Sequence, residues 1–421
     1  MVIISHKSCH GRSFSMSSFK LDLEKNDSAI KDDFFIEDDG FNENGEDNRW
    51  TEQQKNEVGN AVVFSTDWTT ETIINQIHKG NIELNPNFQR RDAWTSKEKS
   101  RFIESLMLGF PIPPIVLAVN NLDRGKYIVL DGKQRLLSLY SFFSNDRDRV
   151  PPLKLTGLKV KEEFNNLTFA KMQSLPECTH DIAFLENQPI RTIVIKNYPH
   201  ESFLYEVFLR LNTGSKPLSP QELRQALHPG AFTSYLDVRA ANSEVLKDIL
   251  NRRTPDFRMR DVELLLRELS YAFFLKEYDG DLKSFLDNTC KTLNKSWDTV
   301  SDSVERYCDQ FEKAHNFTIS IFGKNAYRKY LKGEFVNRFN RGILDSMSFY
   351  FIEDNVRDFL QDKKSEVLEA FINLCKTDAE YMNAIESTTK TIPATRYRIV
   401  RWGKSLSELG APVNIPDLDG E

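Results

Sequence analysis

The hydrophobic pattern of residues 61–230 changes repeatedly between the spacing of strands and the spacing of helices. Short runs rich in Val, Ile and Leu predict strands at four places: 61–64, 115–119, 127–130 and 190–195. Apolar residues three and four positions apart predict helices that begin near residues 69, 95, 132, 203 and 219. Strands and helices are therefore mixed in this part of the chain.

Two of these helices have start signals of their own. Thr95 and Glu98 stand three positions apart, which is the spacing of a capping box. Ser219 stands three positions before Glu222, and Pro220 occupies the first helical position between them. Both helices are thus predicted to begin where a side chain can accept a hydrogen bond from the first turn.

Beyond residue 230, nearly every apolar stripe has helical spacing. This change predicts an α+β first domain followed by an all-helical domain. Residues 1–60 are polar and show little apolar periodicity, which is typical of a disordered segment. The predicted parts are a tail at 1–60, an α+β domain at 61–230, a helical domain at 231–405 and a C-terminal tail at 406–421.

The net charge of −6 lies in the N-terminal segment. Residues 1–60 hold seven Lys and Arg against thirteen Asp and Glu, a difference of six, so the rest of the chain is neutral. A neutral body does not indicate avid, non-specific binding to DNA, which needs a basic face.

The five cysteines stand far apart in the sequence and form no C-x-x-C pair. Their spacing suits neither a disulfide framework nor zinc, so we expect reduced thiols that pack as small apolar groups. The longest apolar run, 106–119, contains three prolines and is too short to cross a bilayer. The N-terminus has no signal-peptide core, and we expect a cytoplasmic protein with no membrane partner.

The sequence Asp131-Gly132-Lys133-Gln134-Arg135 follows a predicted strand and opens a predicted helix. The free N–H groups at a helix start, together with its dipole, attract anions such as phosphate. Gly132 allows a tight turn, Lys133 and Arg135 add positive charge, and Asp131 is suited to hold Mg²⁺ or to orient a water. The alternative is a simple Asp-Gly turn in which Arg135 pairs with Asp131 at the surface.

A second polar segment, Gln89-Arg90-Arg91, lies in an irregular stretch between Phe88 and Trp94. An amide and a guanidinium are groups that clamp phosphates or bind a base edge. The alternative is a packing loop that the two aromatic side chains anchor.

Several motifs occur in a specific order along the chain. The first group is 86–90, 94, 103–106, 109–113 and 131–136; the second is 208–214, 218, 222–224 and 226–227; a weaker third is 261–264 and 285–286. In order and spacing they resemble the N-terminal domain of GmrSD-type restriction endonucleases, over roughly residues 62–350.

The resemblance implies a ParB/sulfiredoxin-like nucleotide-binding domain at 61–230, with a D-G-Q-Q-R motif at the nucleotide site. Members of the family bind nucleoside triphosphates (NTPs) with Mg²⁺, often hydrolyse them, and act in bacterial restriction-type defence against phage DNA. The implied site residues are Asp131, Gln134 and Arg135 for catalysis; Gln89, Arg90, Gly132 and Lys133 for the nucleotide; and Asp131 for the metal.

The chain departs from the family pattern in two ways. Lys133 stands where the family usually has glutamine, which keeps phosphate binding but puts hydrolysis in question. Full-length relatives carry a C-terminal HNH-like nuclease domain with a metal-binding histidine, and no histidine follows His315 in this chain. We therefore expect a protein without its own HNH nuclease, which a separate nuclease subunit would complement.

Three basic clusters are candidates for contact with DNA. They are Arg252-Arg253 with Arg258 and Arg260; Arg328-Lys329 with Lys332, Arg338 and Arg341; and Arg396, Arg398 and Arg401 with Tyr397 and Trp402. Acidic residues stand close to each of these clusters in the sequence. The alternative interpretation is that the clusters are solvated, charged faces of helices that bind no DNA.

Three functions stay open at this level. The first is an NTP-binding protein, with or without Mg²⁺-dependent hydrolysis, in a restriction-type defence system. The second is a non-enzymatic regulator that holds nucleotide or DNA and recruits a nuclease. The third is a nuclease that acts from the first domain through Asp131. Phosphate release distinguishes the first two, and metal-dependent nicking would indicate the third.

Overall fold

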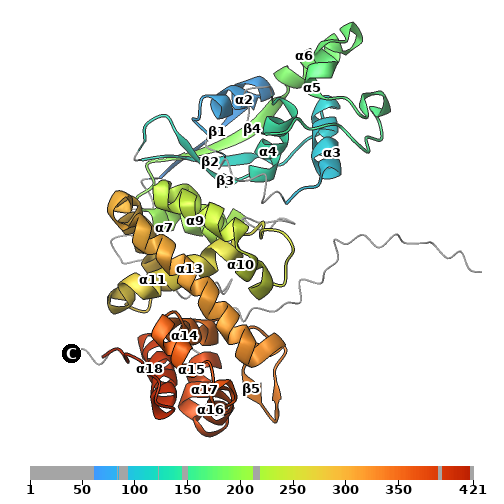
Figure 1. Cartoon of the computed structure of the whole chain (residues 1–421). Coiled ribbons are helices and arrows are strands. Elements are labelled where there is room, and N and C mark those ends of the chain that lie inside the picture. The colour runs from blue at the N-terminus through green and yellow to red at the C-terminus, as the bar shows by residue number, and fades with distance from the viewer. Residues whose placement is uncertain are drawn as a thin grey trace, which may run out of the picture.

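The computed structural model describes residues 61–82, 84, 93–121, 123–144, 150–211, 219–386 and 391–417. A sheet with its helices forms one part of the molecule, and a stack of helices forms the other (Figure 1). The predicted α+β class followed by a helical region is therefore confirmed. The predicted tail at 1–60 lies outside the described residues.

The sheet has four strands in the order β1-β4-β2-β3. Their bounds are β1 Val62–Thr69, β2 Ile115–Val119, β3 Tyr127–Asp131 and β4 Pro189–Lys196. β2 runs parallel to β4, while β1 and β3 run antiparallel to their neighbours. All four predicted strands are present, and β1 extends beyond the predicted 61–64. Because β1 is an exposed edge strand, its second half needs no apolar pattern.

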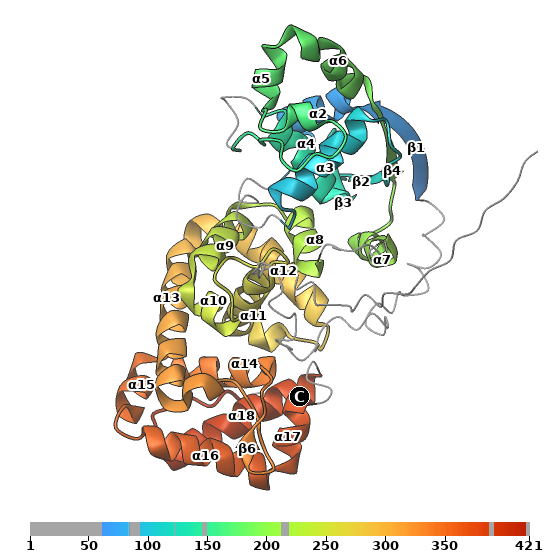
Figure 2. The same cartoon turned by 90° about the vertical axis from the view of Figure 1, so that its right-hand side faces the viewer.

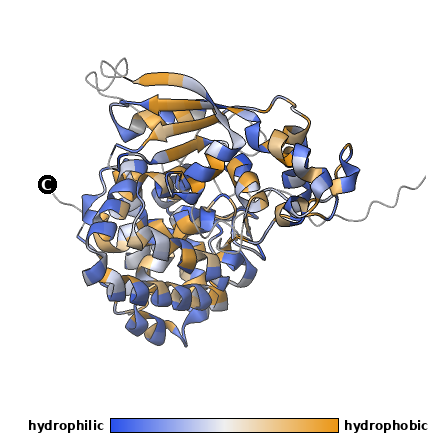
Figure 3. Ribbon diagram, turned by 90° about the horizontal axis from the view of Figure 1, so that it is seen from above, coloured by the Kyte–Doolittle hydropathy of each residue, from blue (hydrophilic) through white to orange (hydrophobic). Residues whose placement is uncertain are grey.

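Helices cover both faces of the sheet. α2 Thr70–His78, α3 Ser96–Met107 and α4 Lys133–Phe142 cover one face, and α7 Glu201–Leu211 and α8 Pro220–Leu227 cover the other. Ile115 and Leu117 of β2 pack in the first core, whereas Val116 and Ala118 pack in the second. This alternation is the two-residue period of a strand with both faces buried, and apolar residues accordingly dominate the inner strands in Figure 3.

Both predicted capping boxes are confirmed. The Thr95 hydroxyl accepts the N–H of Glu98, whose carboxylate accepts the N–H of Thr95. Ser219 and Glu222 make the same reciprocal pair at the start of α8.

A segment of short helices follows α4, which the hydrophobic pattern did not predict. Its elements are η3 Glu162–Phe164, α5 Phe169–Gln173, η4 Pro176–Cys178 and α6 Thr179–Asn187. These helices are too short for a periodic stripe, and α6 buries one residue, Leu185. They lie beside α2 and α3, at the end of the sheet away from the helical part (Figure 1).

The second part of the chain is helical and shares one hydrophobic core. Its helices are α9 Ala231–Asn242, α10 Glu244–Ile249, α11 Arg260–Phe274, η5 Leu275–Glu277, α12 Leu282–Lys295, α13 Trp297–Phe322, η6 Gly323–Asn325, α14 Arg341–Phe351, α15 Asp354–Leu360, α16 Lys364–Thr377, α17 Ala379–Glu386 and α18 Ile392–Glu408. A two-residue hairpin, β5 Tyr330–Leu331 with β6 Glu334–Phe335, interrupts them. α18 continues past residue 405, and Ala411 is buried in the same core, so part of the predicted C-terminal tail belongs to the helical part.

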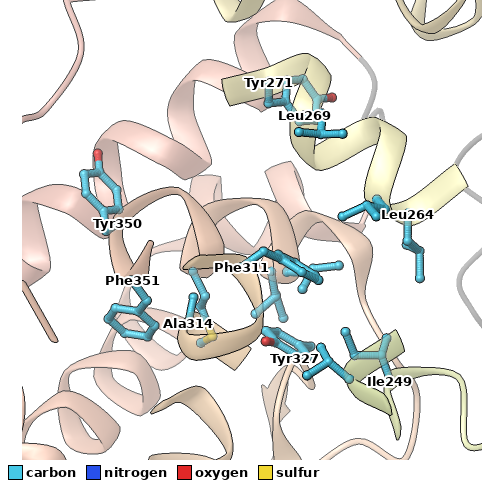
Figure 4. Packing of buried hydrophobic residues seen from close by; sticks show 14 of the residues in the cluster. Ile249, Leu264, Leu269, Tyr271, Phe311, Ala314, Tyr327, Tyr350 and Phe351 are labelled. Carbon is cyan, nitrogen blue, oxygen red and sulfur yellow. The ribbon is translucent and has the colours of Figure 1, made fainter. Parts of the chain in front are cut away.

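The long helix α13 joins the two ends of this core. Phe311 and Ala314 lie among residues from the neighbouring helices, with Ile249 and Leu264 to one side and Phe351 to the other (Figure 4). Because this one helix packs against α9, α10 and α12 and also against α14 and α16, the helical part folds around a single continuous centre.

The four cysteines of the described chain, Cys178, Cys290, Cys308 and Cys375, are buried free thiols, as predicted. Burial raises the pKa of Cys290 to about 12 and that of Cys308 to about 11. Across the described residues, every helix is too short or too polar to cross a membrane.

Glu104 of α3 anchors the segment of short helices. Its Oε1 accepts the backbone N–H groups of Lys159, Val160 and Lys161 at 2.8–3.0 Å. Burial alone would raise the pKa of Glu104, but these three donors outweigh it and leave the pKa lowered. The carboxylate therefore stabilises the fold above its unfolded pKa of about 4.3, and this contribution is lost as the pH falls through the lower folded pKa.

We expect Glu104→Gln to lower the free energy of unfolding by about 2 kcal/mol at pH 7, because a neutral amide replaces a charged acceptor of three buried donors. Urea titrations of wild type and variant at pH 7 and below pH 4 measure the difference. It should shrink at the lower pH, and a difference that does not change with pH would contradict this role of the charge.

Candidate functional site

The motif at residues 131–135 joins the edge strand β3 to helix α4. Asp131 ends the strand, and Gly132 takes the cap position with φ +96° and ψ 13°. No side chain caps the helix, so the N–H groups of its first turn have no intrahelical acceptor. The predicted strand, turn and helix are thus present, with glycine at the left-handed position that it favours.

Arg135 fills the space beside Gly132. A Cβ atom on Gly132 would stand 3.1 Å from both the Arg135 Nη2 and the Ile115 Cγ1. The glycine is therefore needed for its φ angle and also for the close approach of the guanidinium. Larger residues at position 132 would displace Arg135.

Arg135 is paired with Asp131. Its Nη2 donates to Asp131 Oδ2 at 2.7 Å and to the carbonyl of Pro114 at 3.1 Å. This is the ion pair of the simple-turn alternative, but Arg135 is not a surface residue, since its side chain is 13% exposed against 41% for Asp131. The Arg135 Nε and the Gln134 Oε1 are both buried without a hydrogen-bond partner. Two unsatisfied polar atoms in one motif call for an explanation, which a ligand would supply.

Lys133 points away from Arg135, toward α8. Its Nζ donates to Glu222 Oε1 at 2.7 Å, and the side chains are 16% and 6% exposed. The other carboxylate oxygen of Glu222 accepts the N–H of Ser219 in the capping box. The two residues lie 89 positions apart, so this contact joins the first motif group to the second.

A cleft that is open to solvent lies next to this ion pair. Its walls come from β3, α8, the start of α9 and the residue before α11. The apolar part includes Tyr127, Ile128 and Val129 of β3, and the polar part includes Asn120, Lys126, Lys133, Glu222 and Gln225. Figure 2 shows α8 between the sheet and the helical part, which is why the cleft has walls from both.

The charges of the motif balance within the fold. Lys133 and Arg135 each face one carboxylate, that of Glu222 and that of Asp131. An incoming phosphate would therefore compete with these carboxylates for the two cations. The other predicted nucleotide contacts, Gln89 and Arg90, lie outside the described residues.

The structure offers one carboxylate of the motif to a metal. Asp131 Oδ2 is engaged by Arg135, while the side chain remains 41% exposed. Among the residues that the structure describes, no group of three or more His, Cys, Asp or Glu side chains is arranged to hold a metal ion. Mg²⁺ commonly binds through one or two carboxylates together with substrate phosphates, so the donor set is compatible with a metal that arrives with a nucleotide.

A buried polar cluster beneath α8 went unrecognised in the sequence. Arg224 Nε donates to Asp287 Oδ1 at 2.6 Å, and the hydroxyl of Tyr205 donates to the same oxygen at 3.2 Å. Two nearby residues of the second motif group thus make different contacts. Glu222 lines the cleft, whereas Arg224 bonds to Asp287 of α12. Helical spacing alone did not reveal which of these charged residues would be buried.

His228 belongs to the same cluster. It occupies the C-cap position of α8 and is buried. Burial lowers the pKa of His228, although the nearby carboxylates of Asp287 and Glu201 act in the opposite direction. The neutral imidazole therefore belongs to the packed link between the two parts.

Two of the three basic clusters each have two cations held by carboxylates inside the fold. Arg398 is fully buried and bonded to Asp345, and Arg401 is paired with Asp378. Lys329 is paired with Glu386, and Arg341 lies against Glu263. These four cations are held in the helical part and are therefore poor candidates for DNA contact.

Residues 70–229 match the family model described as GmrSD restriction endonuclease, N-terminal domain. The matched range contains β2, β3, β4, the motif at 131–135 and helix α8, and no match to a nuclease domain accompanies it. No curated protein and no solved structure matches the chain.

Proposed function

We propose that the GmrSD restriction endonuclease N-terminal domain, which residues 70–229 match, binds a nucleoside triphosphate beside the motif 131–135. The domain is one of restriction-type defence proteins. Nucleotide binding, a ParB/sulfiredoxin-like relationship and the partners are our proposals. The observation that carries the proposal is an uncapped helix start with two cations, a neighbouring cleft and unsatisfied buried atoms.

The phosphates are proposed to lie at the N-terminus of α4. The N–H groups of the first turn and the helix dipole favour an anion there. Lys133 borders the cleft and would contact the phosphates once it leaves Glu222. The apolar wall of β3 would hold the base, and Gln89 and Arg90, outside the described residues, are the other proposed contacts of the nucleotide.

Asp131 and Arg135 are proposed to act together. Arg135 holds one oxygen of Asp131, which leaves the exposed carboxylate oriented for a Mg²⁺ ion or a water. The metal, when bound, supplies charge neutralisation for the phosphates. Gln134 is the proposed group for a water, since its Oε1 is buried without a partner.

The second candidate function is a regulator that binds nucleotide without turnover and recruits a separate nuclease. One observation favours it. Lys133 replaces the usual glutamine of the motif and is tied to Glu222, so the site has a cation for phosphate where relatives have an amide. In either case a change at the phosphates would act on α8 and through it on the helical part, which shares the cleft.

The test is direct. Each of the four NTPs is added with Mg²⁺ to the full chain, with and without duplex DNA, while phosphate release and the melting temperature are followed. Turnover supports an NTPase, and a raised melting temperature without turnover supports the regulator. If neither changes with any of the four, the nucleotide proposal is wrong.

We expect Glu222→Gln to tighten nucleotide binding by roughly three- to ten-fold, on the order of 1 kcal/mol, because Lys133 loses a competing carboxylate. Glutamine keeps the capping box intact, so the helix start should hold. Isothermal titration measures the change. Glu98→Gln, the same substitution in the capping box of α3, is the matched control. Equal affinity in wild type and Glu222→Gln would argue against phosphate contact by Lys133.

A further inference from the structure

The basic cluster of Arg252, Arg253, Arg258 and Arg260 differs from the other two clusters in where its acidic neighbours lie. It forms the loop at 250–259, between α10 and α11, together with the first residue of α11. Asp256 has a side chain that is 0% exposed, and Asp261 is buried as well. Glu263 is nearly buried against Arg341. In the sequence these three acidic residues offset most of the charge of the four arginines, but in the fold their carboxylates face inward.

Buried groups hold the arginines in place. The carboxylate of Asp256 bonds to Arg260, lies 3.6 Å from Arg252 Nε and accepts the backbone N–H of Arg258 at 2.8 Å. The guanidinium groups of Arg252 and Arg258 lie 5.8 and 5.7 Å from the centre of the Phe257 ring. The loop is therefore supported from within by one carboxylate and one aromatic ring.

Two of the four arginines remain available to a ligand. Arg253 and Arg258 are exposed, and within the described residues neither side chain makes an ion pair. A neighbouring exposed carboxylate, that of Asp248, is engaged by His315 Nε2 at 3.2 Å. Burial lowers the pKa of His315, so this contact does not neutralise the carboxylate. The positive charge on the outer surface of the loop comes from the exposed Arg253 and Arg258.

We propose that this loop, which we call the arginine loop (residues 252–260), binds the phosphate backbone of duplex DNA. Guanidinium groups match phosphate geometry, and a backbone contact needs charge rather than an apolar centre. An acidic protein partner fits less well, because protein interfaces have apolar cores and the one aromatic of the loop lies beneath two guanidinium groups. Single-stranded nucleic acid fits less well for the same reason, because its bases need a free aromatic face.

The arginine loop also borders the candidate nucleotide cleft, since Met259 is one of the residues that line it. DNA at the loop and a nucleotide in the cleft would thus contact the same short segment. The DNA site does not depend on the nucleotide proposal, because its cations lie outside the motif at 131–135.

The test is the salt dependence of binding to a 30-base-pair duplex, measured by fluorescence anisotropy for the full chain without nucleotide. Wild type should bind, and the double variant Arg253→Ala/Arg258→Ala should reduce the slope of log K against log salt by about 2, close to 0.9 for each lost phosphate contact. The matched control is Arg306→Ala/Lys313→Ala, which removes two exposed cations from α13 and should leave the slope nearly unchanged.

Melting temperatures show whether each double variant is folded. The proposal is overturned if wild type does not bind the duplex, or if both double variants lower the slope equally. Tighter binding of a single strand of the same length would overturn the assignment to duplex DNA. Binding of labelled polyglutamate together with no binding to DNA would indicate an acidic protein partner instead.

Discussion

Asp345→Ala is expected to destabilise the helical part of the chain by about 3–5 kcal/mol. Asp345 is 1% exposed and accepts hydrogen bonds from two arginines that are themselves buried. Arg267 donates through Nε and Nη2 at 2.9 and 2.7 Å, and Arg398 donates through Nη2 at 2.8 Å. Without the carboxylate, two buried guanidinium groups lose the anion that bonds to both of them, which explains the size of the effect.

Glu268 sets how much of this loss is recovered. It lies in the same buried region, and burial together with the negative charge of Asp345 raises its pKa well above the ordinary value. The substitution removes the negative charge of Asp345, which is one of the two causes of the raised pKa of Glu268. Glu268 should therefore ionise more readily and offset some of the positive charge of Arg267 and Arg398. Asp345→Ala/Glu268→Gln should therefore be less stable than the sum of the single variants predicts.

Urea denaturation of wild type, the two single variants and the double variant measures both effects. Arg306→Ala, an exposed substitution on α13, is the control and should change stability by less than about 0.5 kcal/mol. A cost below about 1 kcal/mol for Asp345→Ala would show that the two arginines find water or another acceptor.

The elements that the sequence predicted are those whose signals are local. Helix α2 has a periodic apolar face, α3 has a capping box, and β2 is a continuous apolar run. In each case the residues that specify the element lie within about ten positions of one another. The strand, turn and helix around Gly132 were predictable for the same reason, since glycine at the cap position is a local requirement.

The features that the sequence did not predict depend on contacts between distant residues. Lys133 meets Glu222 across the cleft, and Arg224 meets Asp287 beneath α8. Neither partner could be identified from spacing. Arg398 resembled a surface cation in a basic cluster, but the fold places it against Asp345.

The burial of charge is also a tertiary property. Sequence counting treats Asp256 and Arg253 as equal and opposite, which reduces the positive charge that the arginine loop seems to carry. The fold turns the carboxylate inward and the guanidinium outward, so the surface has a charge that the composition does not. This difference explains why net charge alone did not distinguish the three basic clusters.

Arg135→Ala is expected to weaken nucleotide binding by roughly 10- to 100-fold, because hydrogen bonds to charged groups contribute about 1.5–3 kcal/mol. The loss has two sources in the structure. One is a cation at the start of α4, and the other is the fixed position of Asp131, which Arg135 holds at 2.7 Å. Titration of each NTP with Mg²⁺ into wild type and variant measures the change.

Arg135→Lys separates these two sources. Lysine keeps the charge, but its ammonium nitrogen lies at the end of a shorter, non-planar side chain. It does not reproduce the position of the Arg135 Nη2, which now donates to both Asp131 and the carbonyl of Pro114. If charge at the helix start dominates, lysine should restore most of the affinity; if the position of Asp131 dominates, affinity should stay low and its dependence on Mg²⁺ should weaken. Lys126→Ala, which removes a cation from the opposite end of β3 in the same cleft, is the control and should have a smaller effect than Arg135→Ala. Wild-type affinity in a folded Arg135→Ala protein would mean that Arg135 only packs beneath Gly132, and the phosphate site would then have to lie on the Lys133 side of the motif alone.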